Sequence, residues 1–322
     1  MSHVLAIVEA TTLLGKEVRD TLVGKPGSWR EIRLLTTREE EVGALSEVAG
    51  AAALVLRADA DGLSGVDLVF CCGTDEEARQ VLAVLPETAT AVVLAANLED
   101  YAAIAGQPLP PIVAGVNFSR ADQGRVLLSP HPAVVLLAHL LHPLRGLGIE
   151  EAVATVIQPA SMHGDPGIDE LFEQTRQILT MTQRRPTPIF GTQLAFNLLP
   201  TPAPTEPLSK QLHAVLAGDP PVSLQMLQGG VFHSLAASLY VRFVGRTDAK
   251  SLRRTLGQQP HLELAKKPQY LGPIDAAAQG KVLVGAVAEE LSTPGGFWLW
   301  AVMDNLTRGG ALNAVEIAEE VL

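Results

Sequence analysis

The turn after the first apolar run of the chain holds residue types expected near a phosphate group. It reads Val8-Glu-Ala-Thr-Thr-Leu-Leu-Gly15. A strand that passes through a glycine-bearing turn into a helix is where a nucleotide-binding fold holds phosphate, because the helix N-terminus presents free N–H groups. Of the usual glycines only Gly15 is present, and Glu9 would turn negative charge toward a pyrophosphate. The turn predicts a Rossmann-type unit and leaves open whether it binds a dinucleotide.

The two cysteines of the chain, Cys71 and Cys72, end a predicted strand. Adjacent thiols alone make neither a disulfide framework nor a metal cage, which is expected of a protein kept in a reducing cytosol. Ligands of open α/β sheets bind at the carboxyl ends of the strands, so a thiol there is a candidate nucleophile. The alternative is a pair of buried core cysteines.

The charge balance excludes several kinds of partner. The 322 residues carry 24 Lys and Arg against 35 Asp and Glu, a formal net charge of −11. This acidic balance argues against nucleic acid and against an anionic membrane surface. Prolines interrupt the most apolar stretch, Val126 to Leu144, so we expect no membrane span there. With no signal peptide evident, we expect a cytoplasmic globular protein of about two domains.

The first 125 residues alternate between short apolar runs and helical patterns. The runs predict strands over 4–8, 32–35, 51–58, 66–72 and 91–95, with helices over 14–23 and 75–85. Strands separated by helices of this length are typical of βαβ units, and they predict a mainly parallel sheet.

The composition changes after Arg125. Helices are predicted over 133–141, 169–179 and 310–321, and strands over 151–157, 223–227, 235–244, 282–288 and 298–303. The segment 182–207 is rich in proline and polar residues, and we expect it to be an extended surface excursion.

The end of the chain carries the most specific motif. Asp304 to Glu319 reads DNLTRGGALNAVEIAE and closely resembles the terminal signature DNLRKGAALNAVQIAE of aspartate-semialdehyde dehydrogenases. Further matches to that family follow the same order along the chain: Val113–Asn117, Gln158–Ser161, Gly164–Gly167, Ala195–Asn197 and His233-Ser234. The resemblance covers essentially the whole chain.

The resemblance implies an α/β fold of two domains. Residues 1–128 and 304–322 would form the Rossmann-type, NAD(P)-binding domain, with the last helix returning to it, and residues 129–303 an α+β dimerisation and catalytic-type domain. It also implies a homodimer, with tetramers possible, and NADP or NAD as cofactor. The family reduces aspartyl phosphate to aspartate semialdehyde with NADPH, through a thioester on a cysteine.

The family's catalytic roles carry over only in part. His233 corresponds to the acid/base histidine and Gln158 to the glutamine that orients the substrate. The nucleophile lies in an NPNC motif at a helix start, where this chain has Ser129-Pro-His-Pro132, and proline has no nucleophile. The arginine that binds the substrate carboxylate corresponds to Met226, whose thioether makes no charge-assisted contact.

The cofactor residues carry over no better. The family's GATGxVG corresponds to Glu9 through Gly15, and only Ala10, Thr11 and Gly15 are retained. Arg38 is a candidate contact for a 2′-phosphate, one residue out of register, or else a solvated surface arginine. The DNSS segment of the family is Ala95-Ala-Asn97 here. Binding of NADP or NAD therefore stays open.

These combined losses resemble the Usg-like side branch of the family, which keeps the fold without the reactive cysteine. We therefore expect a dimeric binding or regulatory protein whose small-molecule ligand is unknown. Two alternatives stay open: an NAD(P)-dependent oxidoreductase acting on an aldehyde or oxo group of another substrate, with His233 as acid/base, and a structural subunit of a larger assembly.

Three histidines form the remaining candidate cluster. His131, His163 and His233 would converge if the family geometry holds, with Asp165 nearby. Three imidazoles with an open position are typical of zinc, or they could form an anion pocket. The preferred interpretation is three unrelated polar histidines and no metal.

Overall fold

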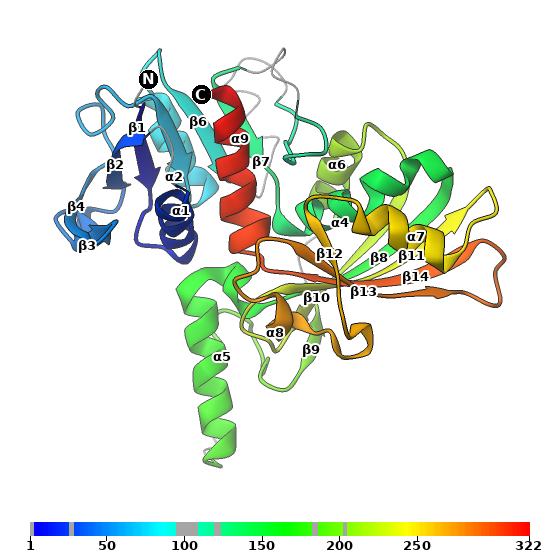
Figure 1. Ribbon diagram of the computed structural model, residues 1–322. Helices are drawn as coiled ribbons and strands as arrows, with labels where there is room; N and C mark the ends of the chain where they lie inside the picture. Colours follow the sequence, from blue (N-terminus) through cyan, green and yellow to red (C-terminus); the bar gives the residue numbers. More distant parts are fainter. Residues whose placement is uncertain (1–2, 26–28, 95–108, 119–123, 182–185, 202–204) are drawn as a thin grey trace. The chain divides into compact units, whose positions relative to one another are not determined.

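The structure is a computed structural model that describes residues 3–25, 29–94, 109–118, 124–181, 186–201 and 205–322 (Figure 1). It comprises two compact units. The first contains residues 1–131 and 310–322, and the second contains residues 132–309. The junctions thus fall after His131 and after Gly309, against the expected junctions after residues 128 and 303. Among the described residues, no helix has both the length and the apolar character needed to cross a membrane.

The first unit is built on a largely parallel sheet. Its strands are β1 (His3–Val8), β2 (Trp29–Thr36), β3 (Leu45–Val48), β4 (Ala51–Arg57), β5 (Leu68–Cys71), β6 (Thr90–Leu94) and β7 (Val126–Ser129). Their spatial order is β3-β4-β2-β1-β5-β6-β7, and only the β3–β4 pair is antiparallel. Leaving β3 aside, this is the 3-2-1-4-5-6 order of dinucleotide-binding folds. The predicted Rossmann-type sheet is confirmed.

Helices cover both faces of this sheet. The helices α1 (Leu13–Gly24) and α9 (Asn313–Val321) share a hydrophobic core with Leu5 and Ile7 of β1. The opposite face of β1 packs with α2 (Asp75–Ala83). The last helix therefore returns to the first unit, as expected. Asn313 anchors it: its Nδ2 donates to the Ile112 carbonyl and to Ser129 Oγ, and its Oδ1 accepts from the Ala114 N–H.

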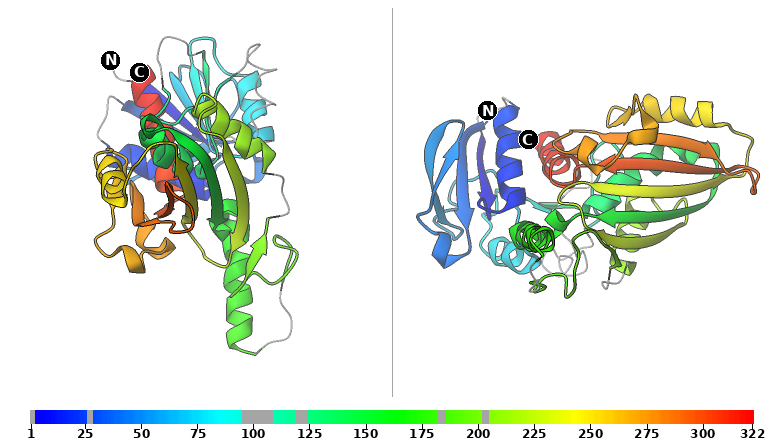
Figure 2. Two further views of the ribbon diagram at one scale, coloured as in Figure 1. Left: turned by 90° about the vertical axis from the view of Figure 1, so that its right-hand side faces the viewer. Right: turned by 90° about the horizontal axis from the view of Figure 1, so that it is seen from below.

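The second unit is built on a mixed sheet, whose strands lie side by side in Figure 2. They are β8 (Ile149–Gln158), β9 (Leu198–Pro200), β10 (Val222–Gly229), β11 (Leu235–Phe243), β12 (Leu262–Leu264), β13 (Val282–Glu289) and β14 (Gly296–Met303). The order is β12-β13-β14-β11-β8-β10-β9, with parallel pairing only in β8–β10 and β12–β13.

The helices of the second unit differ in their surroundings. They are α4 (Pro132–Leu141), α5 (Gly164–Leu179), α6 (Glu206–Val215), α7 (Ala249–Gly257) and α8 (Pro273–Ala276). Every residue of α4 from Ala133 to Leu141 is buried. The helix α5 instead extends away from the sheet (Figure 1).

Three predicted segments need correction. The helix predicted from residue 169 begins at Gly164, since Pro166 lies in the first turn, where a missing N–H is tolerated. The C-terminal helix is preceded by a π-helix over Thr307–Leu312. The segment 182–207 is not wholly a surface excursion, because Leu194 and Ala195 are fully buried against Ala160 and Leu171.

The buried helix α4 contains a histidine side chain that is shielded from solvent. His139 is 4% exposed, and its Nε2 has no hydrogen-bond partner. Its ring lies 4.8 Å from that of His261. Burial, reinforced by the positive charge of Arg308, holds the pKa of His139 well below its ordinary value. His139 is therefore neutral in the folded chain.

This neutral histidine predicts a loss of stability in acid. The unfolded chain binds a proton at His139 below a pH of about 6.5, whereas the folded chain does not. The free energy of unfolding should therefore fall below that pH, by at most about 1.4 kcal/mol per pH unit for this group. His139→Leu should flatten the pH dependence measured by denaturant titration. An unaltered slope in His139→Leu would contradict the assignment.

Candidate functional site

In the second unit, the side chains of Gln158 and His163 both form hydrogen bonds with the amide oxygen of Gln228. Gln158, at the end of β8, lies in register with Gln228 on β10. Gln158 Nε2 donates to Gln228 Oε1 over 2.9 Å, and His163 Nε2 lies 3.1 Å from the same oxygen. The Gln228 amide N–H groups donate to the carbonyls of Gln158 and Gly229, which orients the amide. His163 is therefore a donor at Nε2, because an amide oxygen only accepts.

Sequence reasoning missed Gln228. It follows Met226 by two residues, and side chains two apart on a strand share a face. The signal that could have identified Gln228 is this spacing of two residues from Met226, the position expected to correspond to the family's arginine. Met226 is 4% exposed in the structure, so a buried thioether stands where a carboxylate-binding cation was expected.

Backbone hydrogen bonds hold His233 beside the segment of Gln158 and His163. The N–H groups of Ala160 and Ser161 donate to the carbonyls of Val231 and Phe232. Asn305 Oδ1 accepts from Ser161 Oγ at 3.1 Å and from the Ser234 N–H at 3.0 Å. These bonds hold the two loops side by side. His233, which lies between the bonded residues Phe232 and Ser234, is half-buried. Gln158 and His233, the two residues predicted to retain family roles, therefore lie in one region of the second unit.

Pro132 is the first residue of α4. It packs closely on Gly309, where an added Cβ would lie 2.7 Å from the Pro132 Cβ. The helix N-terminus that would lower a thiol pKa therefore carries a saturated ring with no reactive atom.

The described residues contain no group of three or more His, Cys, Asp or Glu side chains that could hold a metal ion. His131 belongs to the first unit, and burial lowers the pKa of its imidazole to about 4. His163 and His233 belong to the second unit, where the Nε2 of His163 is bonded to Gln228.

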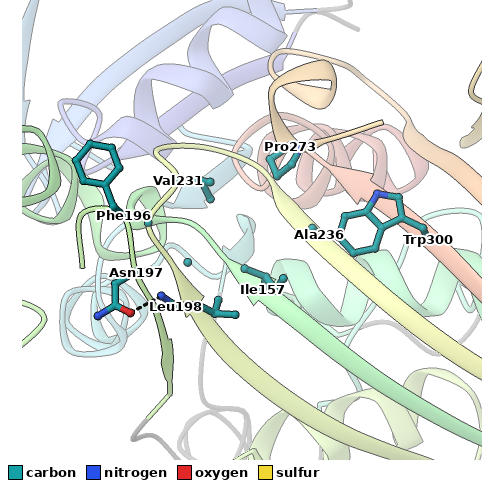
Figure 3. Close-up of a pocket in the computed structure, with 10 residues that line it drawn as sticks. Ile157, Phe196, Asn197, Leu198, Val231, Ala236, Pro273 and Trp300 are labelled. Atoms are coloured by element: carbon teal, nitrogen blue, oxygen red, sulfur yellow. Dashed lines mark hydrogen bonds between the residues drawn. The ribbon is translucent and has the colours of Figure 1, made fainter. Parts of the chain in front are cut away.

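An apolar cavity of about 480 Å³ opens near the ends of β8 and β11 (Figure 3). Its walls include Ile157, Val231, Ala236 and Trp300. Ile157 precedes Gln158 on β8, so the two side chains point to opposite faces of the sheet. The cavity therefore lies on the face away from the glutamine pair.

In the first unit, the Glu9 carboxylate is fully buried at the predicted phosphate turn. Its Oε1 accepts from the N–H and the hydroxyl of Thr37, each at 2.7 Å. Its Oε2 accepts from Thr36 Oγ1 at 2.9 Å and lies 3.3 Å from Arg38 Nε. Glu9 therefore satisfies its hydrogen bonds with groups at the end of β2.

Arg38 is neither a solvated surface residue nor an open phosphate ligand. Its guanidinium pairs with Glu77 at 2.8 Å and with Glu41 and Glu9 at 3.3 Å each. The Glu77 hydrogen bond, with the other carboxylates, raises the pKa of Arg38. The arginine is held by the chain's own acids.

The other predicted cofactor residues serve the turn itself. Thr11 Oγ1 donates to the Glu41 carboxylate, and Ala10 is buried. Gly15 packs against the turn, since an added Cβ would lie 2.8 Å from Ala10 Cα. The 95–97 segment lies outside the described residues. The side chains of Glu9, Thr11 and Thr12 and the N–H of Gly15 are thus bonded within the chain at this turn.

The two thiols of the first unit are also inaccessible. Cys71 and Cys72 are both buried and free. Burial, with a smaller contribution from the Glu9 charge, raises the pKa of Cys71 to about 12. Burial likewise raises the pKa of Cys72 well above its ordinary value. Since the thiolate is the nucleophile, neither group is activated.

Comparison with known families assigns the second unit. Residues 141–308 match the family model described as semialdehyde dehydrogenase, dimerisation domain. The match includes the glutamine pair, His233 and the first residues of the terminal signature, Asp304 to Arg308. A dimerisation domain indicates that the chain forms homo-oligomers.

Individual proteins extend the similarity to the whole chain. A USG-1 protein homolog from Azotobacter vinelandii is 29% identical over 332 residues, covering 98% of this chain and 96% of the relative. The structure of a probable aspartate-semialdehyde dehydrogenase from Pseudomonas aeruginosa is 25% identical, with a TM-score of 0.89 over 100% of this chain and 98% of that one. An aspartate-semialdehyde dehydrogenase structure with NADP from Candida albicans shares the fold, at 15% identity and a TM-score of 0.73 over 99% and 98% of the two chains.

The buried thiols yield a direct prediction. Iodoacetamide at pH 8 should leave Cys71 and Cys72 of the folded protein unmodified, because both remain protonated and inaccessible. Mass spectrometry should detect two adducts only after denaturation. A Ser64→Cys variant, with its thiol at an exposed position, should be alkylated in the folded state. Rapid alkylation of either native cysteine in the folded chain would refute this assignment.

Proposed function

The chain belongs to the semialdehyde dehydrogenase family, and on that premise we propose that it has lost the thioester-dependent reaction and acts as a dimeric binding or regulatory protein. The observation that carries the proposal is the proline at the N-terminus of α4, where the family's reactive cysteine is expected. A thioester needs a sulfur nucleophile, and the ring of Pro132 supplies none.

No other thiol of the chain substitutes for the missing one. Cys71 and Cys72 are the only cysteines in the sequence, and both belong to the first unit. Their raised pKa values keep them as thiols at neutral pH. A direct route from acyl phosphate to enzyme-bound thioester is therefore closed in this chain.

The charge at the retained site supports the same conclusion. The buried position expected to bind a substrate carboxylate holds Met226. Its polar neighbours on the same strand and on β8 are Gln228 and Gln158, which are neutral amides. Neutral amides recognise a ligand through hydrogen bonds alone. A family substrate with a free carboxylate is instead expected to be bound by the charged guanidinium of an arginine. We infer that the ligand of this site is a small molecule recognised without that charge pair.

The terminal signature is retained because it supports the architecture. Asp304 accepts from the N–H groups of Leu306, Thr307 and Ala278. Asn305 joins the loops of Ser161 and Ser234, as described above. None of these bonds depends on a nucleophile, so the fold can persist without the reaction.

We place the homodimer contact on the face of the second sheet that bears Trp298. This side chain is 43% exposed and packs against Tyr240, with ring centroids 5.2 Å apart. Tyr240 pairs in turn with Val153 of β8, which is half-buried. The apolar cavity at Ile157 opens on the same face. An aromatic, partly exposed sheet face within a dimerisation domain is suited to a second copy of the chain.

We further propose a cytoplasmic location, consistent with two free thiols.

The activity assay tests the loss of the reaction. With aspartate semialdehyde, phosphate and NADP, the protein should show no turnover above the uncatalysed rate, because Pro132 cannot form a thioester. The matched sample is a Cys71→Ala/Cys72→Ala variant, which should behave identically. Turnover comparable to that of an active family enzyme would overturn the proposal.

A single substitution should test the dimer face. Trp298→Arg places a charge on the face while leaving Glu290, the hydrogen-bond acceptor of Trp298, with a partner. Sedimentation velocity should show a shift from dimer to monomer, because a charge would be desolvated at the interface. Leu45→Arg, at an exposed apolar position in the first unit, should remain dimeric. Equal dimer stability in both variants would exclude this face.

A further inference from the structure

The Glu9 carboxylate lies where the strand order of the first unit places a ligand. In open parallel sheets, ligands bind outside the carboxyl ends of the strands, at the point where the strand order reverses. In this sheet that point lies between β1 and β5, with β2 on the other side of β1. Glu9 directly follows β1, Thr37 and Arg38 follow β2, and Gly73 lies just beyond β5.

The groups around this carboxylate are those that bind a phosphate. Two hydroxyls, one backbone N–H and one guanidinium surround it, all within 3.3 Å. Charge-assisted contacts of this kind suit any small oxyanion. Because the carboxylate is 0% exposed, water does not compete with it for these donors. The end of β2 is therefore an anion-binding site that is occupied by the carboxylate of Glu9.

The backbone and the neighbouring strand are shaped around Glu9. Its φ of +58° is in the left-handed region, which is strained for a residue with a side chain. Such a conformation persists where surrounding contacts determine it. A Cβ added at Gly73 would lie 2.6 Å from Glu9 Cγ. The absence of a side chain at Gly73 thus makes room for the side chain of Glu9.

The charges beyond Glu9 also oppose a phosphate. Glu9, Glu41 and Glu77 present three carboxylates to the single guanidinium of Arg38. At the start of α1, Thr12 Oγ1 accepts from the Gly15 N–H at 3.0 Å, so a side chain caps an amide that a pyrophosphate would use. The local charge is thus already negative, and the Gly15 N–H already has a partner within the chain.

We propose that Glu9 is an internal ligand that closes the dinucleotide site of the first unit, and that removing its side chain exposes a site for the 2′-phosphate of an adenine dinucleotide. The carboxylate and the phosphate require the same donors and cannot be bound together. This inference is independent of Pro132 and of the loss of the thioester reaction.

Binding calorimetry with the full-length protein tests the closed site. Wild-type protein should bind neither NADP nor NAD at millimolar ligand concentration. Glu9→Gly removes the carboxylate and relieves the positive φ, and added Glu77→Gln removes a second charge while keeping a residue able to complete the helix cap at Thr74. The double variant should bind NADP at least about tenfold more tightly than wild type, and more tightly than it binds NAD.

The matched control is Glu41→Gln, which removes one carboxylate from Arg38 without vacating the donors of Thr36 and Thr37. It should bind no more NADP than wild type. Micromolar binding of NADP by wild type would overturn the inference whatever the variants do, and so would equal gains in Glu41→Gln and Glu9→Gly. A double variant that stays folded by circular dichroism but binds no NADP would also overturn it. Wild-type NADP binding without semialdehyde turnover would reject the closed site and leave the proposed function intact.

Discussion

A buried amide or carboxylate loses its contacts with water and must find partners inside the protein, and this requirement holds the loops of the chain in place. Glu170 accepts from the N–H groups of Ile189 and Phe190. Gln174 Oε1 accepts from those of Leu194 and Ala195. Leaving such a group unpaired costs about 1–3 kcal/mol, so each side chain fixes the backbone that it bonds. Asn305 and Asn313 do the same within the second and first units.

This division of labour separates architecture from chemistry. The residues most specific to the family signature, Asp304, Asn305 and Asn313, bond backbone and hydroxyl groups of their own unit. The proposed loss of the nucleophile and of the substrate cation, at Pro132 and Met226, leaves these loop-holding bonds in place. The family's fold and signature can therefore persist independently of the groups that the reaction requires.

The fold was largely predictable, because hydrophobic periodicity records which face of each element is buried. The parallel sheet followed from apolar runs such as Val4–Val8 and Ala91–Val93, which are buried on both faces. The short strands β3, β9 and β12 carry no comparable run, since pairing with a neighbour decides their conformation. The start of α5 was missed for a local reason, because Gly164 and Pro166 are typical of loops and also fit the first turn of a helix.

The sequence by itself determined the family, the two-domain α/β plan and the absence of a cysteine at position 132, because these depend on residue types in order along the chain. Only the tertiary structure decided where Glu9, Arg38 and Gln228 direct their side chains. Their partners are far apart in sequence: Arg38 meets Glu77, and Gln228 meets Gln158. Hydrogen bonds and ion pairs depend on distances of a few ångströms, and no spacing along the chain specifies those distances across a sheet. Arg38, for which the sequence left open a phosphate contact or a solvated surface position, is held by three acids.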